Sequence, residues 1–136
     1  MSLPAPSECP AIRVMMFPRD TNANGTIFGG VILSYIDQAG AIEARRHAPH
    51  KFVTVTMDKI EFKKPVFVGD VLSFFARITR VGRSSIGMTV SVTAQRFTDP
   101  REIVPVTEAN LVYVSVNDHG VPVPLGLPQS QGSISV

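Results

Sequence analysis

One carboxylate stands out in an otherwise apolar stretch of the sequence. Asp37 lies among residues whose apolar side chains recur at helical spacing, so its charge must be solvated, paired or used. A catalytic carboxylate in such a place serves as a general base or as a nucleophile, whereas a non-catalytic one is an ordinary exposed or capping acid. Asp37 is therefore the first candidate catalytic residue, with both interpretations open.

Two adjacent glycines precede this carboxylate. Gly29 and Gly30 stand where the predicted helix begins, so their N–H groups are unpaired and lie at the positive end of the helix dipole. Glycine lets a ligand approach the backbone closely, and such N–H groups can stabilise an oxyanion. The alternative is that the pair only permits close packing of the helix against a strand.

The glycine pair and the carboxylate are too far apart to act on one carbonyl group within a single chain. Gly29 precedes Asp37 by eight residues, a rise of about 12 Å along a helix at 1.5 Å per residue. If two such helices pack antiparallel across a two-fold axis, Gly29 of one chain faces Asp37 of the other. The spacing therefore predicts two equivalent composite sites in a dimer.

The elements that position these residues are one helix and a set of strands. Apolar residues at i, i+3 and i+4 predict a helix from Gly29 to about His47, closed by Pro49. The apolar phase slips before Ile60, which predicts a β-bulge near Asp58. Period-two alternation predicts strands over residues 53–57, 71–81, 86–94 and 103–116, with room for a short strand over 12–17.

One helix and antiparallel strands make an α+β layout in which the sheet wraps the helix. Five strands cannot enclose the helix alone, so we expect edge-to-edge dimerisation. Only 18% of the 136 residues are charged, which also favours a covered subunit surface. The length predicts a single domain at residues 11–126, between a flexible tail at 1–10 and an irregular tail at 127–136.

Composition excludes several classes of function. The formal charge is only +2, and no run of like charges exceeds two residues, so nucleic-acid binding is not expected. Cys9 is the only cysteine, which fits a reducing, cytoplasmic compartment. No apolar run approaches 18 residues and the N-terminus has no signal-peptide pattern, so we expect neither a membrane span nor secretion.

A series of motifs resembles one enzyme family. In chain order they are DTNANGTIFGG (20–30), IDQAGAI (36–42), VTV (53–55), PV (65–66), VGD (68–70) and GRSS (82–85). Together they are similar to the hotdog-fold acyl-CoA thioesterases, and most of all to the YciA-type branch, which is related to the brain acyl-CoA hydrolases. The resemblance runs from about Met15 to Leu125.

The resemblance implies a hotdog fold, in which a curved antiparallel sheet of five or six strands wraps a long central helix. It implies dimers that form through the sheet and commonly assemble as a trimer of dimers, that is, a hexamer. The implied reaction is hydrolysis of acyl-CoA to free CoA and a carboxylic acid, as in fatty acid metabolism. Asp37 matches the family's catalytic aspartate and Asn22 its loop asparagine, with Asn24 as a neighbouring candidate. Phe28 stands where many relatives have histidine, so a purely backbone oxyanion hole is expected here.

This resemblance assigns a role to each candidate. The N–H of Gly29 polarises the thioester carbonyl, Asp37 of the other subunit activates water or attacks directly, and Asn22 orients the water or the thioester. The phosphates of CoA need charged and hydroxyl donors, which the turn at 82–85 and the lysines before Pro65 supply, unless that turn is only a solvated basic surface. The residues expected to bind substrate are Gly30, Asn24, Lys64 (or Lys63), Arg83, Ser84 and Ser85.

Two other functions compete with hydrolysis. A non-catalytic acyl-CoA-binding hotdog module would keep the basic turn and dispense with the acid, so Asp37 and Asn22 argue against it. A hotdog dehydratase needs a histidine base, and none of the three histidines lies in the segment 22–37. No metal or separate cofactor is expected, because His47, His50 and His119 form no ligand pattern.

Overall fold

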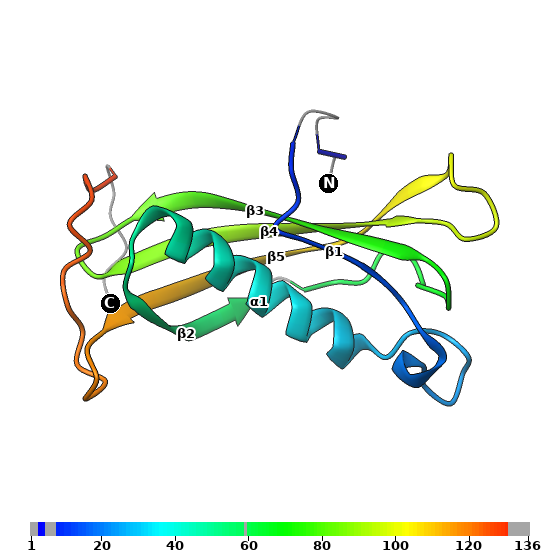
Figure 1. The fold of residues 1–136 in the computed structure, drawn as a ribbon, viewed down its shortest axis with the longest axis horizontal. Coiled ribbons are helices and arrows are strands. Elements are labelled where there is room, and N and C mark those ends of the chain that lie inside the picture. Colours follow the sequence, from blue (N-terminus) through cyan, green and yellow to red (C-terminus); the bar gives the residue numbers. More distant parts are fainter. Residues whose placement is uncertain (1–2, 5–7, 59, 131–136) are drawn as a thin grey trace.

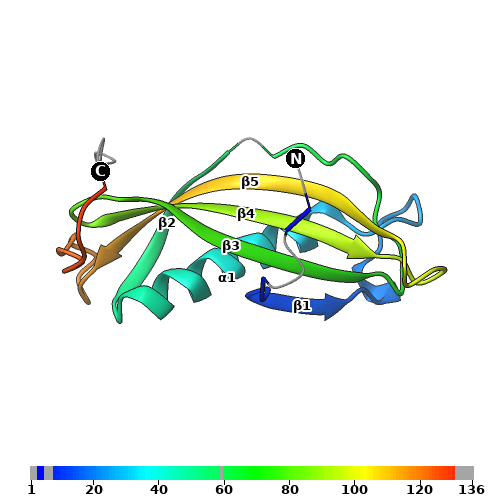
Figure 2. The same cartoon turned by 90° about the horizontal axis from the view of Figure 1, so that it is seen from above.

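The computed structural model describes residues 3–4, 8–58 and 60–130. Within these ranges the elements are β1 Ile12–Met15, the 3₁₀ turn η1 Pro18–Asp20, α1 Gly29–His47, β2 Lys51–Asp58, β3 Val71–Val81, β4 Ser85–Gln95 and β5 Ile103–Val116. The strands form one antiparallel sheet in the order β1-β3-β4-β5-β2. Seen from above, this sheet curls over α1 (Figures 1 and 2). The predicted α+β layout is confirmed.

The helix α1 begins and ends where the sequence predicted. Its buried residues include Ile32 and Ile36, which repeat at helical spacing and belong to the core shared with the sheet. It ends at His47 because Pro49 disfavours a helical backbone in the residue before it, and Ala48 is extended with φ −147°. Basic side chains fill the last turn, where the negative end of the helix dipole favours them.

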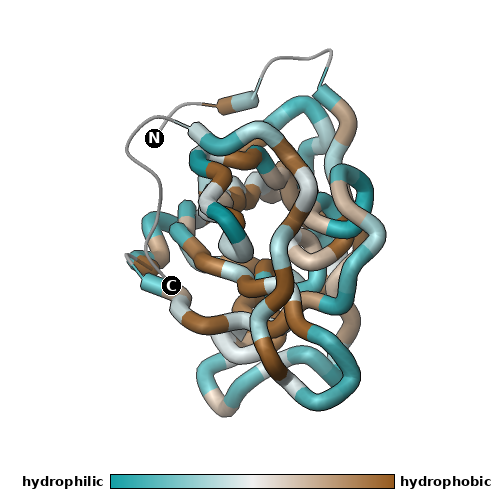
Figure 3. Tube along the Cα trace, turned by 90° about the vertical axis from the view of Figure 1, so that its left-hand side faces the viewer, coloured by the Kyte–Doolittle hydropathy of each residue, from teal (hydrophilic) through white to brown (hydrophobic). Residues whose placement is uncertain are grey.

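β4 lies at the centre of the sheet and is buried along nearly its whole length. Figure 3 shows the apolar positions gathered toward the interior, with polar positions in the outer loops. The core residues of the three central strands include Leu72, Phe74, Ile86, Met88, Val90, Val92, Val106 and Leu111. The strands β1 and β2 are left as the two edges of the sheet.

β2 contains a bulge, but not where the sequence predicted it. The register against β5 shifts at Val55, between its two threonine neighbours, rather than near Asp58. The slip of the apolar phase before Ile60 marks instead the end of the strand. Beyond it the chain leaves β2 and hydrogen-bonds to β5 through the N–H of Lys63. The predicted bulge position was therefore wrong.

A buried ion pair fastens the connection between β2 and β3. Asp70 and Arg96 lie 2.8 Å apart, with 3% and 11% of their side chains exposed. The Asp70 carboxylate also accepts the N–H groups of Phe67 and Phe97, and Arg96 donates to the main-chain oxygen of Pro65. The pair therefore fixes the loop 65–70 against the ends of β3 and β4.

The helix and the sheet share one hydrophobic core within the described residues. The predicted division into a domain at 11–126 and two tails stays a prediction, and residues 1–2, 5–7 and 131–136 of those tails lie outside the described ranges. Near the end of the described chain, Ser130 hydrogen-bonds to Val81. No helix in the described part has both the length and the apolar character that crossing a membrane requires.

Candidate active site

Asp37 lies half-way along α1, and its carboxylate is held through one oxygen only. Its Oδ1 accepts a hydrogen bond of 2.6 Å from the Thr54 hydroxyl and one of 3.2 Å from the Tyr113 hydroxyl. Among the residues that the structure describes, none donates to Oδ2. A half-buried carboxylate with one fixed and one open oxygen is suited to take a proton or to attack a carbonyl carbon.

Tyr113 contacts Asp37 from the buried side of the helix. Its side chain is 1% exposed, and its hydroxyl also donates over 2.8 Å to the main-chain oxygen of Asp37. Burial raises the pKa of Tyr113, and the negative charge of Asp37 and the hydrogen bond to it raise that pKa further. The phenol therefore stays protonated and remains a donor throughout the neutral pH range.

Gly40 makes room for the phenol beside the helix. A Cβ atom at this position would lie 2.8 Å from two ring carbons of Tyr113 and would overlap its hydroxyl oxygen. Contacts below 3.0 Å require the ring to move, and the ring is packed in the core. Glycine at this position is therefore what allows a tyrosine of the sheet to reach the backbone of α1.

The two hydroxyl donors come from one cross-strand pair. Thr54 on β2 and Tyr113 on β5 are partners in the sheet register, and the bulge at Val55 follows directly. Neither residue was predicted from the sequence as a site residue. A threonine in an alternating strand is typical of a sheet surface, and a tyrosine among apolar residues is typical of a core. Only the pairing of β2 with β5 identifies them.

The first turn of α1 borders a cleft of about 210 Å³. Gly29 and Lys64 both line it, together with the ring of Phe62. Within the described residues, the N–H groups of Gly29 and Gly30 have no acceptor, as is usual for the first turn of a helix. The structure therefore brings the predicted oxyanion donor and one predicted phosphate contact to the same cleft.

Asn22 closes the loop that precedes α1. Its Oδ1 accepts the N–H groups of Asn24 and Thr26, and its Nδ2 donates to the Thr26 hydroxyl over 3.0 Å. The Asn24 side chain is exposed. The geometry gives Asn22 a part in shaping the loop, and the roles of both asparagines toward water or substrate stay predictions.

The hairpin turn between β3 and β4 lies beside the carboxyl end of α1, at the opposite end of the molecule from the glycine pair (Figure 1). Arg83 is exposed in this turn. Ser84 and Ser85 are only 7% and 1% exposed, and each already has an interaction partner. Of the three turn residues predicted to bind phosphate, Arg83 alone presents its side chain to solvent.

The histidines lie away from Asp37. His47 contacts Glu43 at 2.9 Å on the last turns of α1, and His50 contacts the main-chain oxygen of Leu125 at 3.0 Å. His119 is exposed in the turn after β5. Across the described ranges, no group of three or more His, Cys, Asp and Glu side chains is arranged to hold a metal ion.

Comparison with known proteins identifies the family. The family model described as "Thioesterase superfamily" matches residues 24–98, more than half of the chain. The chain belongs to the thioesterase superfamily. Asp37, the glycine pair, Thr54 and Lys64 all lie within the matched part of this thioesterase, whereas Asn22 and Tyr113 lie outside it.

Individual relatives agree with this assignment. The thioesterase is 49% identical over 86 residues to an uncharacterised acyl-CoA thioester hydrolase of Zymomonas mobilis, a match that covers 63% of this chain and 58% of that relative. It is 39% identical over 116 residues to the acyl-CoA thioester hydrolase YciA of Salmonella typhimurium, covering 84% and 87% of the two chains. The match to the first relative therefore spans less than two thirds of its length.

A solved structure gives the same result for the fold. The thioesterase matches a hexameric hotdog fold thioesterase of Campylobacter jejuni with a TM-score of 0.80 and 46% identity, over 86% of this chain and 90% of that one. The expected hotdog fold, with one long helix against a curled sheet of five strands, is confirmed.

Proposed function

We propose that this thioesterase hydrolyses the thioester bond of acyl-CoA to give free CoA and a carboxylic acid. The observation that carries the proposal is the Asp37 carboxylate, which has one oxygen fixed by two hydroxyl groups and one without a partner among the described residues. Two relatives reported above bear the name acyl-CoA thioester hydrolase.

The chemistry uses groups that the chain itself supplies. A water molecule, which Asn22 helps to orient, adds to the thioester carbonyl carbon while its proton passes to Asp37. Negative charge develops on the carbonyl oxygen, and the N–H of Gly29 stabilises it by about 3–4 kcal/mol. Collapse of this intermediate breaks the C–S bond, and Asp37 returns the proton to the sulfur of CoA. Direct attack by Asp37, through a mixed anhydride, would use the same residues.

The site is shared between two chains that pair through β2. This strand is an edge of the sheet, and its Val53 and Val55 side chains are 42% and 47% exposed, so a second copy has apolar surface to cover. A two-fold partner brings its own Gly29 to this Asp37, which one helix cannot do because about 12 Å separates the two residues along its axis. The Campylobacter jejuni relative is hexameric, and we propose a trimer of dimers for this protein.

A mixture of two inactive variants tests the shared site. Asp37→Ala and Asn22→Ala are each expected to be inactive, and refolding them together should restore about a quarter of wild-type activity. Half of the dimers are then mixed, and each mixed dimer holds one intact site and one site with both lesions. A mixture of Asp37→Ala with Asp37→Asn is the control and should stay inactive. If the first mixture also stays inactive while native mass spectrometry shows mixed dimers, Asn22 and Asp37 serve one site from the same chain.

Arg83 and Lys64 are proposed to contact the phosphates of CoA. Arg83→Ala is expected to raise the KM for acyl-CoA about tenfold or more with little change in kcat, because a contact remote from the thioester contributes mainly uniform binding. Steady-state kinetics at moderate salt measures this effect. Arg101→Ala, which removes an exposed arginine from the other hairpin, should leave KM unchanged. An unchanged KM for Arg83→Ala would make the turn an ordinary solvated surface.

The direct test of function is a thiol-release assay on acyl-CoAs of increasing chain length, without added metal or nucleotide. We expect free CoA to appear, because backbone N–H, carboxylate and water complete the site and no cofactor besides the CoA of the substrate is proposed. Failure on short, medium and long acyl-CoAs, with acyl-CoA binding retained, would support the non-catalytic binding module instead. We also propose a cytoplasmic location, since a reducing compartment suits a chain with a single cysteine.

A further inference from the structure

We propose that Tyr113 is a positioning residue that determines which oxygen of Asp37 reacts and adjusts to the protonation state of that carboxylate. This inference rests on the proposed role of Asp37 as the base. Tyr113 and Thr54 both hold Oδ1, so Oδ2 is the oxygen that takes the proton from water. With 1% of its side chain exposed, Tyr113 acts through Asp37 and does not touch the substrate.

The hydroxyl hydrogen of Tyr113 has two acceptors within reach, and both belong to Asp37. The hydroxyl oxygen lies 2.8 Å from the main-chain oxygen and 3.2 Å from Oδ1. A phenol has only one hydrogen to donate. That hydrogen is therefore shared between the two acceptors, or it turns from one to the other by rotation about the C–O bond, without movement of any heavier atom.

The protonation state of Asp37 decides which acceptor is preferred. An ionised carboxylate accepts stronger hydrogen bonds than a neutral carbonyl group, so the hydrogen turns toward Oδ1 when Asp37 is ready to act as a base. Once Oδ2 has taken the proton, Oδ1 is a weaker acceptor and the hydrogen turns to the main-chain oxygen. The phenol keeps a hydrogen bond in both states, and no buried donor is left unpaired during turnover.

The surroundings hold the phenol in the place that this exchange requires. Gly40 leaves space for the hydroxyl against the helix backbone, and a Cβ there would displace it. The register of β2 against β5 sets Thr54 opposite Tyr113. Because Thr54 approaches Oδ1 at 2.6 Å, the carboxylate does not rotate when the phenol hydrogen turns away.

No charged side chain among the described residues hydrogen-bonds or forms an ion pair with Asp37, whose two side-chain partners are the neutral hydroxyls of Thr54 and Tyr113. On α1 itself, Glu43 is paired with Arg46 and His47. The remaining titratable groups on the strands packed against α1 are Lys51 and Asp58 on β2, Arg77 and Arg80 on β3, and Glu108 on β5. Tyr113, which stays protonated, is therefore the residue whose hydrogen bond responds to the protonation state of Asp37.

The first test measures how Tyr113 responds to the protonation of Asp37, without an activity assay. The chain contains two tyrosines, so protein labelled with ¹³C at tyrosine Cζ gives two such resonances, and Tyr35→Phe assigns them. We expect the Tyr113 resonance to move as falling pH protonates Asp37, and to stay fixed over the same range in Asp37→Asn. A Tyr113 resonance that is insensitive to pH, or equally sensitive in Asp37→Asn, would overturn the proposal.

The second test uses the pH dependence of hydrolysis. Tyr113→Phe should lower kcat about tenfold with KM within about twofold, and should move the acidic limb of the kcat/KM profile to higher pH, because the ionised carboxylate loses a hydrogen-bond donor. Gly40→Ala, which keeps the phenol but displaces it, should move the limb in the same direction. Tyr35→Phe removes a hydroxyl that has no hydrogen bond among the described residues and should behave as wild type.

The outcomes separate this inference from the proposed function. A general loosening of the fold in Tyr113→Phe would lower activity without moving the acidic limb, and that result counts against the inference. If wild-type protein hydrolyses no acyl-CoA, the proposed function fails, yet the resonance test still shows whether Tyr113 follows Asp37. If wild-type protein is active and Asp37→Ala is not, an unmoved limb in Tyr113→Phe overturns the inference alone.

Discussion

Replacing Asp37 with alanine is expected to lower kcat for acyl-CoA hydrolysis at least about 100-fold, while KM changes little. In the proposed mechanism the carboxylate acts in the transition state, where it takes the proton of the attacking water, and contributes little to holding the CoA part of the substrate. Thiol release at saturating acyl-CoA measures the effect, and calorimetric titration with CoA checks that binding persists.

Two further variants make this experiment specific to the carboxylate. Asp37→Asn keeps the size of the side chain and an oxygen for the Thr54 hydroxyl, but it cannot take a proton, so it should be nearly as inactive as Asp37→Ala. Asp118→Ala removes an exposed carboxylate from the turn after β5 and should leave turnover unchanged. Turnover close to wild type in Asp37→Ala would remove this residue from the mechanism.

Replacing Asp70 with alanine is expected to lower the free energy of unfolding by about 3–5 kcal/mol, because the Arg96 guanidinium would remain buried without its counter-charge. The N–H groups of Phe67 and Phe97 would lose their acceptor at the same time. Urea unfolding at one fixed protein concentration measures the loss, since the stability of an oligomer depends on concentration.

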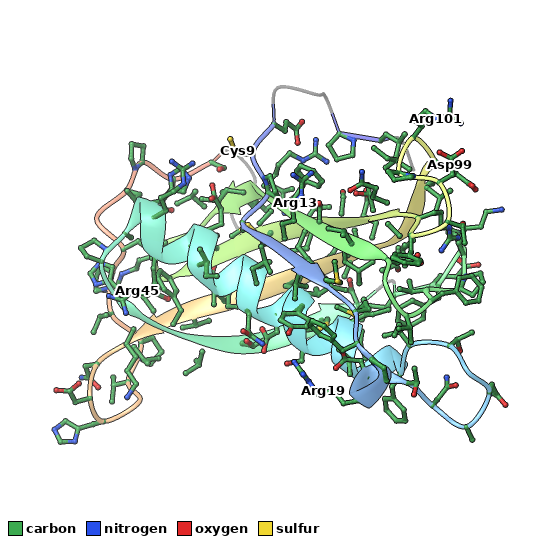
Figure 4. All side chains as sticks on the ribbon, turned by 45° about the vertical axis from the view of Figure 1, so that its right-hand side comes forward. Cys9, Arg13, Arg19, Arg45, Asp99 and Arg101 are labelled. Carbon is green, nitrogen blue, oxygen red and sulfur yellow. The ribbon has the colours of Figure 1, made fainter. Side chains whose placement is uncertain are left out.

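A solvent-exposed ion pair provides the control for the buried pair of Asp70 and Arg96. Asp99 and Arg101 lie at the tip of the hairpin between β4 and β5 (Figure 4), with 42% and 91% of their side chains exposed. Asp99→Ala should change stability little, because water already solvates both charges. Replacing Asp70 and Arg96 together with apolar residues should recover part of the loss. A loss in Asp70→Ala as small as that in Asp99→Ala would contradict the structural role of the buried pair.

The sequence predicted the elements well where one periodicity dominates over many residues. The helix bounds Gly29–His47 follow from helical spacing with Pro49 beyond the end, and the hairpin of β3 and β4 follows from alternation on both sides of a Gly-Arg-Ser-Ser turn. The position of the bulge in β2 was predicted wrongly because Val53, Val55 and Met57 alternate without interruption through the bulged residue Val55. The hydrophobic periodicity of a sequence does not show whether an apolar residue of an edge strand faces the core or a second copy of the chain.

The site was predictable only in part, for a physical reason. Asp37 is conspicuous because a charge interrupts an apolar helix, and glycines at a helix start mark accessible N–H groups. Thr54 and Tyr113 become site residues only through the pairing of two strands that are distant in sequence, which local patterns do not contain. Local patterns also do not show burial: Ser84 and Ser85 lie in a turn that the sequence predicts to be exposed, but both are buried in the folded chain.

The strand order determines when the site can form as the chain is synthesised. Asp37 and Tyr113 are 76 positions apart, and β2 finds its partner only in the last strand of the sheet. A nascent chain that has left the ribosome as far as β4 already carries α1 and Thr54, but neither the phenol nor the strand to which β2 binds. Contacts so distant in sequence form after local hairpins. In such incomplete chains the Asp37 carboxylate therefore lacks its fixed geometry, and the proposed hydrolytic activity requires that β5 has been synthesised.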